Sequence, residues 1–260
     1  PDNLPQRCAA IRSSMRRYAL SKRPMSYLLG RVRFEWRRLR RYLKTPGMVI
    51  AILGVDGAGK STVIDAILPA LQAATHNAVW VQHLRPGLLP ALARLKGQKN
   101  VSTGPVLEPH GSEPSGSLGS IVRLVYLTLD YWLGYWFRVR PKIAKQPTVV
   151  LFDRYAYDMA LDPRRFRIGL PAPVAGLFAK LAPKPDLILC LQGDPEIIAA
   201  RKRELPIEET RRQVEALRAF ASKESRAVVI ATDTQVSETR DQVLGTILKL
   251  LSQKQDQRYG

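Results

Sequence analysis

The chain has 260 residues, which is enough for one α/β domain with extensions or for two small domains. Its apolar fraction of 45% is ordinary for a globular protein with a hydrophobic core. The formal net charge is +19, but residues 1–46 alone hold 13 basic and 2 acidic residues, a net charge of +11. Because the excess charge is concentrated in this segment, a nucleic-acid footprint spread over the whole domain is disfavoured.

Residues 1–46 are expected to form a basic amphipathic helical extension. Between Met25 and Lys44 one helical face carries Leu28, Val32, Trp36, Leu39 and Leu43. Much of the remaining surface is covered by arginines, namely Arg31, Arg33, Arg37, Arg38, Arg40 and Arg41. Such a helix can lie on an anionic membrane surface. It can equally dock its apolar stripe on the main domain and leave the arginines in solvent, and a nucleic-acid arm is a third alternative.

The first predicted strand, Met48–Leu53, is a short apolar run that leads directly into a phosphate-binding pattern. The pattern G-x-x-x-x-G-K-[ST] has its fixed positions filled by Gly54, Gly59, Lys60 and Ser61, within the stretch Gly54, Val55, Asp56, Gly57, Ala58, Gly59, Lys60, Ser61 and Thr62. Apolar residues at helical spacing predict a helix from Ser61 to about Ala74. Glycines let backbone N–H groups point at phosphate, Lys60 reaches the β- and γ-phosphates, and the Ser61 hydroxyl ligates Mg²⁺. This stretch therefore predicts binding of a nucleoside triphosphate, with ATP and Mg²⁺ as the expected pair.

A second strand is predicted at Ala78–Leu84, and the turn that follows it carries Arg85. Ligands of open α/β sheets bind outside the carboxyl ends of the strands, so this guanidinium is a candidate binding group. Leu88–Leu95 is predicted to be a short helix. The glycine-, serine- and proline-rich segment 96–120 is predicted to be a long mobile loop.

A long helix is expected to begin near Ser120 and to end before Pro141. Within it, Arg123 and Asp130 interrupt the longest apolar stretch and favour a core helix over a membrane span. The two cysteines, Cys8 and Cys190, are far apart in the sequence, which favours reduced thiols and a cytoplasmic protein.

The remaining chain continues the alternation of strands and helices. Strands are predicted at Thr148–Phe152, Asp186–Leu191 and Arg226–Ile230. Helices are predicted to start at Pro195, to run from about Pro206 to Lys223, and to run from Val236 to Leu251. The alternation predicts an α/β fold with a five-stranded parallel sheet and helices on both faces. We expect this domain at residues 47–252, with a lid near 201–206 and a polar tail at 253–260.

Three motifs resemble the thymidylate kinase family of P-loop nucleoside monophosphate kinases, and the likeness covers residues 48 to about 250. The P-loop is close to the family's form, in which an acidic residue at the Asp56 position faces the acceptor. Asp153-Arg154-Tyr155 is similar to the Asp-Arg-Tyr/His signature that follows the third strand. Asp194-Pro195 leads toward Arg201 and Arg203 as the family's segment leads into its arginine-bearing lid. The resemblance implies an ATP-dependent kinase.

Three departures fall where the acceptor would sit. The family's usual Arg-Glu-Pro-Gly is Leu84-Arg85-Pro86-Gly87 here, and its Asp-Arg pair in the long helix is replaced by Asp130 and Tyr131. The loop after Asp-Arg-Tyr, from Asp158 to Arg165, is also different. The sequence is more similar to the divergent thymidylate-kinase-like proteins associated with bacterial envelope-polysaccharide synthesis. We therefore expect an acceptor other than dTMP, such as a hydroxyl of a sugar or glycolipid.

The resemblance implies roles for a defined set of residues. Catalysis is assigned to Lys60, Asp153, Arg154, Asp56, Arg201 and Arg203, and Mg²⁺ binding to Ser61 and Asp153. Acceptor binding is assigned to Asp56, Arg85, Arg123, Tyr131, Arg154, Tyr157 and Asp158, with Arg164 and Arg165 as further anion-binding candidates. A hydroxyl acceptor needs a carboxylate base, for which Asp56 and Asp158 are candidates.

Two other functions remain open. A thymidylate or other nucleoside monophosphate kinase would need cationic clamps for its acceptor but no base. A P-loop NTPase with a basic binding arm would have no small-molecule acceptor at all. The partners expected are ATP, a small-molecule or glycan acceptor, an anionic membrane surface at the inner face of the membrane, and a second copy as a homodimer.

Overall fold

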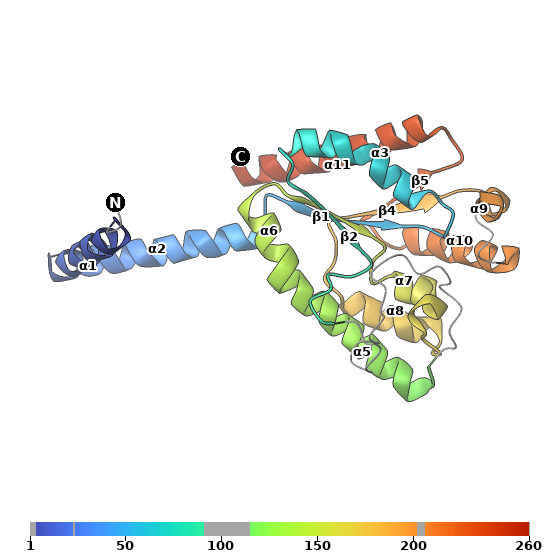
Figure 1. Cartoon of the computed structure of the whole chain (residues 1–260), viewed down its shortest axis with the longest axis horizontal. Coiled ribbons are helices and arrows are strands. Elements are labelled where there is room, and N and C mark those ends of the chain that lie inside the picture. The colour runs from blue at the N-terminus through green and yellow to red at the C-terminus, as the bar shows by residue number, and fades with distance from the viewer. Residues whose placement is uncertain (1–3, 23, 91–114, 202–205, 260) are drawn as a thin grey trace. The chain divides into compact units, whose positions relative to one another are not determined.

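The computed structural model describes residues 4–22, 24–90, 115–201 and 206–259. The chain divides into two compact units, Pro1–Lys44 and Thr45–Gly260. The first unit contains the helices α1 (Leu4–Lys22) and α2 (Pro24–Leu43) (Figure 1). Within the described residues, every helix is too short or too polar to cross a bilayer.

The second unit is built on a parallel five-stranded sheet, as the sequence predicts. Its strand order is β2-β3-β1-β4-β5. The strands are β1 (Met48–Leu53), β2 (Val79–His83), β3 (Val149–Asp153), β4 (Leu187–Gln192) and β5 (Ala227–Ala231). Each lies within one residue of its predicted bounds. Because β1 occupies the centre of the order, the loop that follows it emerges beside the carboxyl ends of β3 and β4.

Helices cover both faces of this sheet (Figure 1). On one face, α3 (Lys60–Ala74) and α11 (Val236–Tyr259) pack against Met48, Ile50 and Ile52 of β1. The opposite face buries Val49, Ala51 and Leu53 of β1, and it is covered mainly by the long helix α5 (Ser117–Gly134) and by α8 (Ala172–Leu181). The helical elements there and at the edges are α5 (Ser117–Gly134), α6 (Arg140–Lys145), α7 (Asp158–Leu161), η2 (Pro163–Phe166), α8 (Ala172–Leu181), α9 (Pro195–Arg201) and α10 (Ile207–Ala221). Burial on both faces explains why the strands are almost continuously apolar.

The long helix differs from its prediction. It does not end before Pro141, because a π-helical segment, η1 (Tyr135–Val139), joins α5 to α6. Pro141 lies at the start of α6, where a missing backbone N–H is tolerated.

Two other predicted helices also differ. The helix expected to end at Leu251 continues through most of the polar tail to Tyr259. Leu88, Leu89 and Pro90 are not helical, and the rest of the predicted helix Leu88–Leu95 lies outside the described residues, as does most of the loop predicted at 96–120.

Candidate functional site

The loop after β1 has the backbone of a phosphate cradle. Gly57 and Gly59 have φ values of 88° and 83°, a left-handed conformation that favours glycine. The Ala58 N–H donates to the Val55 carbonyl at 3.1 Å, and α3 begins at the next residue after Gly59. The loop thus turns its backbone inward at the positive end of a fifteen-residue helix, as an anion site requires.

Lys60 lies within this loop and contacts its backbone. Its Nζ atom donates to the carbonyls of Gly54 and Val55 at 2.8 and 2.9 Å, and it lies 3.8 Å from a carboxylate oxygen of Asp56. Burial, together with the positive charge of Arg154, lowers the pKa of Lys60 to about 8. The ammonium is thereby held at the loop where the β- and γ-phosphates of a nucleotide would lie.

Asp153 ends β3 beside the loop, with Ile52 and His83 as its partners across the sheet. Its Oδ2 atom lies 3.1 Å from Nδ1 of His83. Burial raises the pKa of Asp153, but the hydrogen bond with His83 and the charge of Lys60 outweigh it, so the net direction is downward. Its Oδ1 atom is buried and has no hydrogen-bond partner in the described part of the chain.

These oxygens fit a Mg²⁺ ion. Mg²⁺ binds oxygen ligands and usually retains several waters, so one carboxylate and one hydroxyl from the protein are sufficient. The unpaired oxygen of the ionised Asp153 and the exposed Ser61 at the start of α3 provide that pair. Thr62 is exposed beside Ser61.

Arg154 forms the centre of the charged cluster. It has a φ of 75°, and its backbone N–H donates to the Ile52 carbonyl at 3.0 Å. This bend turns the side chain under the loop, where it is only 4% exposed. Its guanidinium donates to Asp56, and to Asp158 at 3.3 Å. Burial lowers the pKa of Arg154, but Asp158, Asp56 and Asp153 together raise it above its ordinary value.

A second arginine, Arg165, binds the other oxygen of Asp56. Arg165 is positioned by η2, where Asp162 accepts from its Nε at 3.2 Å and from its backbone N–H at 3.3 Å. Asp56 is therefore held between Arg154 and Arg165, with Lys60 on a third side. The sequence marked Arg165 only as one of several candidate anion-binding arginines. Its partner is 109 residues away, which no local pattern could identify.

Asp158 and Asp162 line a small cavity on the inner side of the loop. Burial raises the pKa of Asp158, although Arg154 opposes it. One oxygen of Asp158 accepts from the backbone N–H of Tyr155 at 2.9 Å. The cavity is bounded by Gly54, Val55, Arg154, Asp158, Leu161, Asp162, Gln213 and Leu217.

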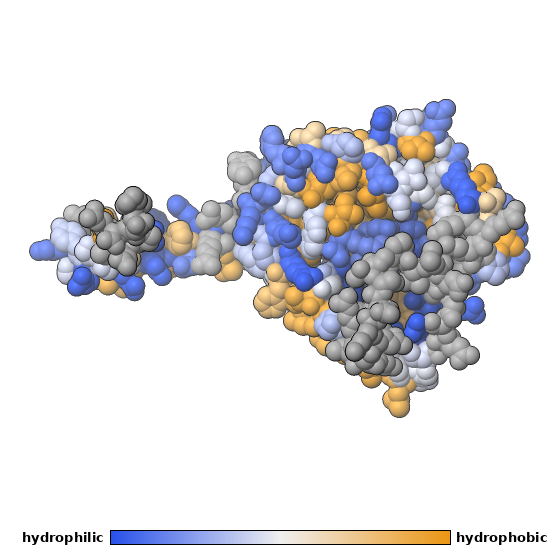
Figure 2. Space-filling model, viewed as in Figure 1, coloured by the Kyte–Doolittle hydropathy of each residue, from blue (hydrophilic) through white to orange (hydrophobic). Residues whose placement is uncertain are grey.

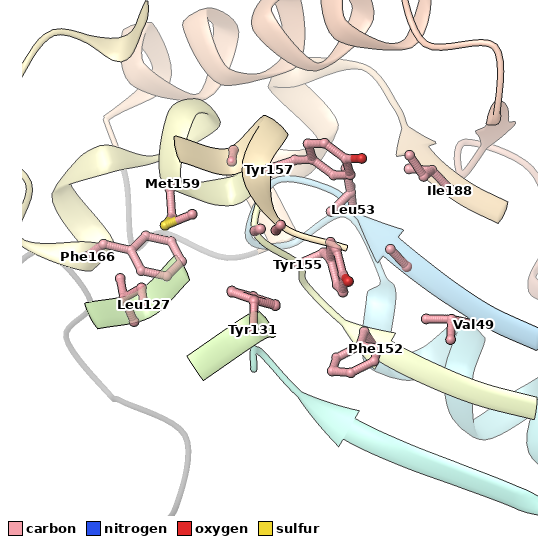
Figure 3. Close-up of a cluster of buried hydrophobic side chains, with 14 of the residues drawn as sticks. Val49, Leu53, Leu127, Tyr131, Phe152, Tyr155, Tyr157, Met159, Phe166 and Ile188 are labelled. Atoms are coloured by element: carbon pink, nitrogen blue, oxygen red, sulfur yellow. The ribbon is translucent and has the colours of Figure 1, made fainter. Parts of the chain in front are cut away.

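Tyr131 and Arg85, both expected to bind the acceptor, have structural partners. Tyr131 is 1% exposed and lies among Leu127 and Tyr155 in the core, a correction to its expected place at the acceptor (Figure 3). Its hydroxyl donates to the Leu84 carbonyl. Arg85 pairs at 2.8 Å with Asp130, whose carboxylate also accepts from two backbone N–H groups of the turn after β2. Both side chains therefore fix this turn.

The other predicted residues are more dispersed. Tyr157 is buried against Phe220, and burial raises its pKa to about 12. Arg123 is half-buried on α5, where burial and nearby Arg167 lower its pKa. Arg201, at the end of α9, donates to the Thr232 carbonyl at 3.3 and 3.4 Å. Arg203 lies outside the described residues, as does most of the predicted lid.

Neither a family model nor a curated protein matches the sequence. The structure is similar to that of thymidylate kinase from Ehrlichia chaffeensis, with a TM-score of 0.53 and 14% sequence identity. The match covers 77% of this chain and 98% of that chain. The chain therefore has the α/β fold of a P-loop kinase such as thymidylate kinase.

Proposed function

We propose that the protein is an ATP- and Mg²⁺-dependent phosphotransferase. The observation that carries the proposal is the assembly of Lys60, the P-loop backbone, Asp153 and Arg154 at the carboxyl edge of one parallel sheet. Phosphoryl transfer depends mainly on positioning and on neutralising charge, and these residues supply both. Cytoplasmic ATP would be the donor.

In the proposed reaction, the inward-facing amides of the loop bind the phosphates and Lys60 neutralises the β- and γ-oxygens. Ser61 and Asp153 would hold Mg²⁺, which when bound would supply positive charge that offsets the charge of the phosphates. Arg154, which pairs with Asp56, is proposed to bridge from the donor toward the acceptor. Arg201 and Arg203 are proposed to close over the donor.

The proposed acceptor is a hydroxyl of a sugar or glycolipid. In the thymidylate kinase family an Asp-Arg pair of the long helix helps to hold the nucleotide acceptor, whereas here Tyr131 is buried and Arg85 is paired with Asp130. A hydroxyl acceptor needs a carboxylate base within hydrogen-bond reach. Both oxygens of Asp56 bind arginines, which favours an orienting role for it. Asp158 also accepts from Arg154 and from the Tyr155 backbone, but it binds one arginine instead of two, lines the cavity beside the loop and has a raised pKa, so it is the better candidate base.

The second candidate is a thymidylate kinase, the activity named for the structural neighbour. The observation in its favour is the pair of guanidiniums, Arg154 and Arg165, on one carboxylate, because such a pair could also bind a nucleotide phosphate. The third, a P-loop NTPase without an acceptor, would leave this arginine pair without a ligand.

The test is phosphate transfer from γ-labelled ATP by the full chain to dTMP, other nucleoside monophosphates, sugars and glycolipids, including lipid-linked sugars of bacterial envelope-polysaccharide synthesis. Labelling of a sugar or glycolipid, with little labelling of dTMP, is the expected result. Efficient labelling of dTMP would replace this proposal with thymidylate kinase. ATP hydrolysis with no labelled acceptor in the panel would favour the NTPase.

A further inference from the structure

Among the described side chains of the N-terminal unit, those on one face of α2 are apolar and exposed. We name this face the α2 stripe: Met25, Leu28, Leu29, Val32, Trp36 and Leu39. Each member is between 47 and 69% exposed. In Figure 2, apolar side chains appear at the surface of this unit among hydrophilic ones. An exposed stripe of this extent marks a site of interaction with a partner or a membrane.

The rest of the α2 surface is strongly basic. Arg31, Arg33, Arg37 and Arg40 are exposed, and Glu35 is the only acidic residue in the sequence of α1 and α2. At 100° per residue, Arg33 and Arg40 border one edge of the stripe, and Arg37 lies further round the helix. The α1 helix repeats the pattern, with exposed Ile11, Met15 and Tyr18 beside exposed Arg12, Arg16 and Arg17.

We infer that the N-terminal unit binds the surface of an anionic lipid bilayer through the α2 stripe. Such helices bury their apolar face at the boundary between headgroups and acyl chains while cationic side chains remain with the lipid phosphates. Trp36 lies within the stripe, and tryptophan is favoured at this depth. Nucleic acid would satisfy the arginines but would leave the stripe in water, so the combined pattern favours lipid. This inference does not depend on phosphotransfer, because binding is measured without ATP.

The helix supplies its own matched control. Phe34 is 54% exposed and Trp36 is 64% exposed, but Phe34 lies on the arginine side of α2 and Trp36 lies in the stripe. Trp36→Gln and Phe34→Gln each replace an exposed aromatic ring with a neutral amide. The full chain and both variants would be sedimented with vesicles of phosphatidylcholine alone and of phosphatidylcholine with 30 mol% phosphatidylglycerol, in low and high salt.

The parent chain is expected to bind the anionic vesicles at low salt and to be released as the salt concentration rises. It should not bind the neutral vesicles. Trp36→Gln should weaken binding at least tenfold and Phe34→Gln less than twofold. The double variant Arg37→Gln/Arg40→Gln removes two charges, each worth about fivefold in affinity at low salt, so it should weaken binding by roughly 25-fold.

Several results would overturn the inference. One is no vesicle binding by the parent chain, and another is equal loss in Trp36→Gln and Phe34→Gln. A lowered melting temperature in Trp36→Gln alone would show that the stripe packs against protein, and conversion of a dimer to a monomer would assign that packing to a second copy. Tight binding to duplex DNA that is unaffected by Trp36→Gln would make the unit a nucleic-acid arm.

Discussion

Lys60 should make nucleotide affinity depend on pH. Its pKa is lowered to about 8, so the ammonium is charged below that pH and neutral above it. We expect ATP affinity to be flat from pH 6 to 7.5. Above pH 8 it should fall by up to about tenfold per unit, because binding must then take up a proton. Calorimetric titration with Lys60→Arg, which stays charged, should show no such fall. A parent affinity that is unchanged up to pH 9.5 would contradict this role.

The Lys60→Ala variant tests the donor assignment directly. It removes the cation beside Gly54 and Val55 without introducing bulk. Phosphate transfer should fall below detection while the thermal unfolding transition remains cooperative. Phosphate transfer by Lys60→Ala at the parent rate would contradict the assignment of Lys60 to the ATP phosphates.

Substitutions of Asp153 and of Arg154 should affect phosphate transfer in different ways. Asp153→Asn keeps the shape of the side chain but removes its charge, so the Mg²⁺ concentration needed for half-maximal transfer should rise, and kcat should fall about a hundredfold. Arg154→Ala should slow transfer with little effect on ATP affinity. It should also destabilise the fold by about 3–5 kcal/mol, because buried Asp158 loses its guanidinium partner and Asp56 keeps only one of its two. Arg154→Lys, which keeps the charge, should recover part of that stability. Equal losses of ATP binding and transfer would place Arg154 on the donor side.

The proposed roles of Asp56 and Asp158 can be distinguished by the pH dependence of phosphate transfer in their variants. Asp158 must be ionised to act as a base, and its pKa is raised by burial. Activity should therefore fall on the acid side at a higher pH than an ordinary aspartate gives. Asp158→Asn should abolish transfer to a hydroxyl acceptor, whereas Asp56→Asn should mainly raise KM, since it loosens Arg154 and Arg165. An acid limb that moves in Asp56→Asn and persists in Asp158→Asn would reverse the two roles.

At the scale of elements, the contact between α5 and the turn after β2 is close enough to require glycine. A Cβ atom added to Gly134 would lie 2.3 Å from Cβ of Pro86. The same turn is held by Asp130, and by Arg138, which donates to the Pro86 and Gly87 carbonyls. Gly134→Ala should therefore destabilise the fold by about 1–3 kcal/mol. Gly245→Ala on α11, where the added Cβ meets nothing within 4 Å, is the control. Equal melting temperatures for the two variants would contradict the packing argument.

Elements with strong local signals were predictable from the sequence. All five strands were found within one residue because a strand buried on both faces is a short apolar run between turns. The long helix was misjudged at Pro141, since proline ends a helix by local rules but is tolerated where a new helical segment begins. The extension of α11 to Tyr259 was missed because its last turns carry few apolar residues.

The donor half of the site was predictable to a greater extent than the acceptor half. A P-loop is contiguous in sequence, so its spacing alone identifies Gly54, Lys60 and Ser61 as a group. The proposed acceptor half is the cluster of Asp56, Arg154 and Arg165, which meet only when β1, β3 and η2 are in place. Tyr131 was assigned to the acceptor from its position in a motif, and its burial depends on the packing of α5, which the motif does not encode.

At the scale of the whole molecule, the division of the chain separates the proposed chemistry from the proposed membrane surface. Every described residue of the candidate site lies in Thr45–Gly260, and that unit contains the whole sheet and both hydrophobic clusters. The match covers 98% of the solved thymidylate kinase but 77% of this chain, so part of this chain lies outside the matched fold. The N-terminal unit is therefore expected to add a property to the kinase fold without completing it.

A chain that starts at Thr45 tests this expectation. It should unfold cooperatively at a temperature close to that of the full chain and keep its kcat toward a soluble acceptor, because no site residue is removed. It should also lose binding to anionic vesicles and the salt dependence that accompanies it. If the acceptor is a glycolipid, the truncated chain should transfer phosphate more slowly only when that acceptor is embedded in anionic vesicles, since a surface-bound enzyme meets it at a higher local concentration. Precipitation or a large fall in melting temperature would instead show that the α2 stripe packs on the Thr45–Gly260 unit. If the full chain and the truncated chain transfer phosphate to the embedded acceptor at equal rates, the N-terminal unit does not help the enzyme to reach that acceptor.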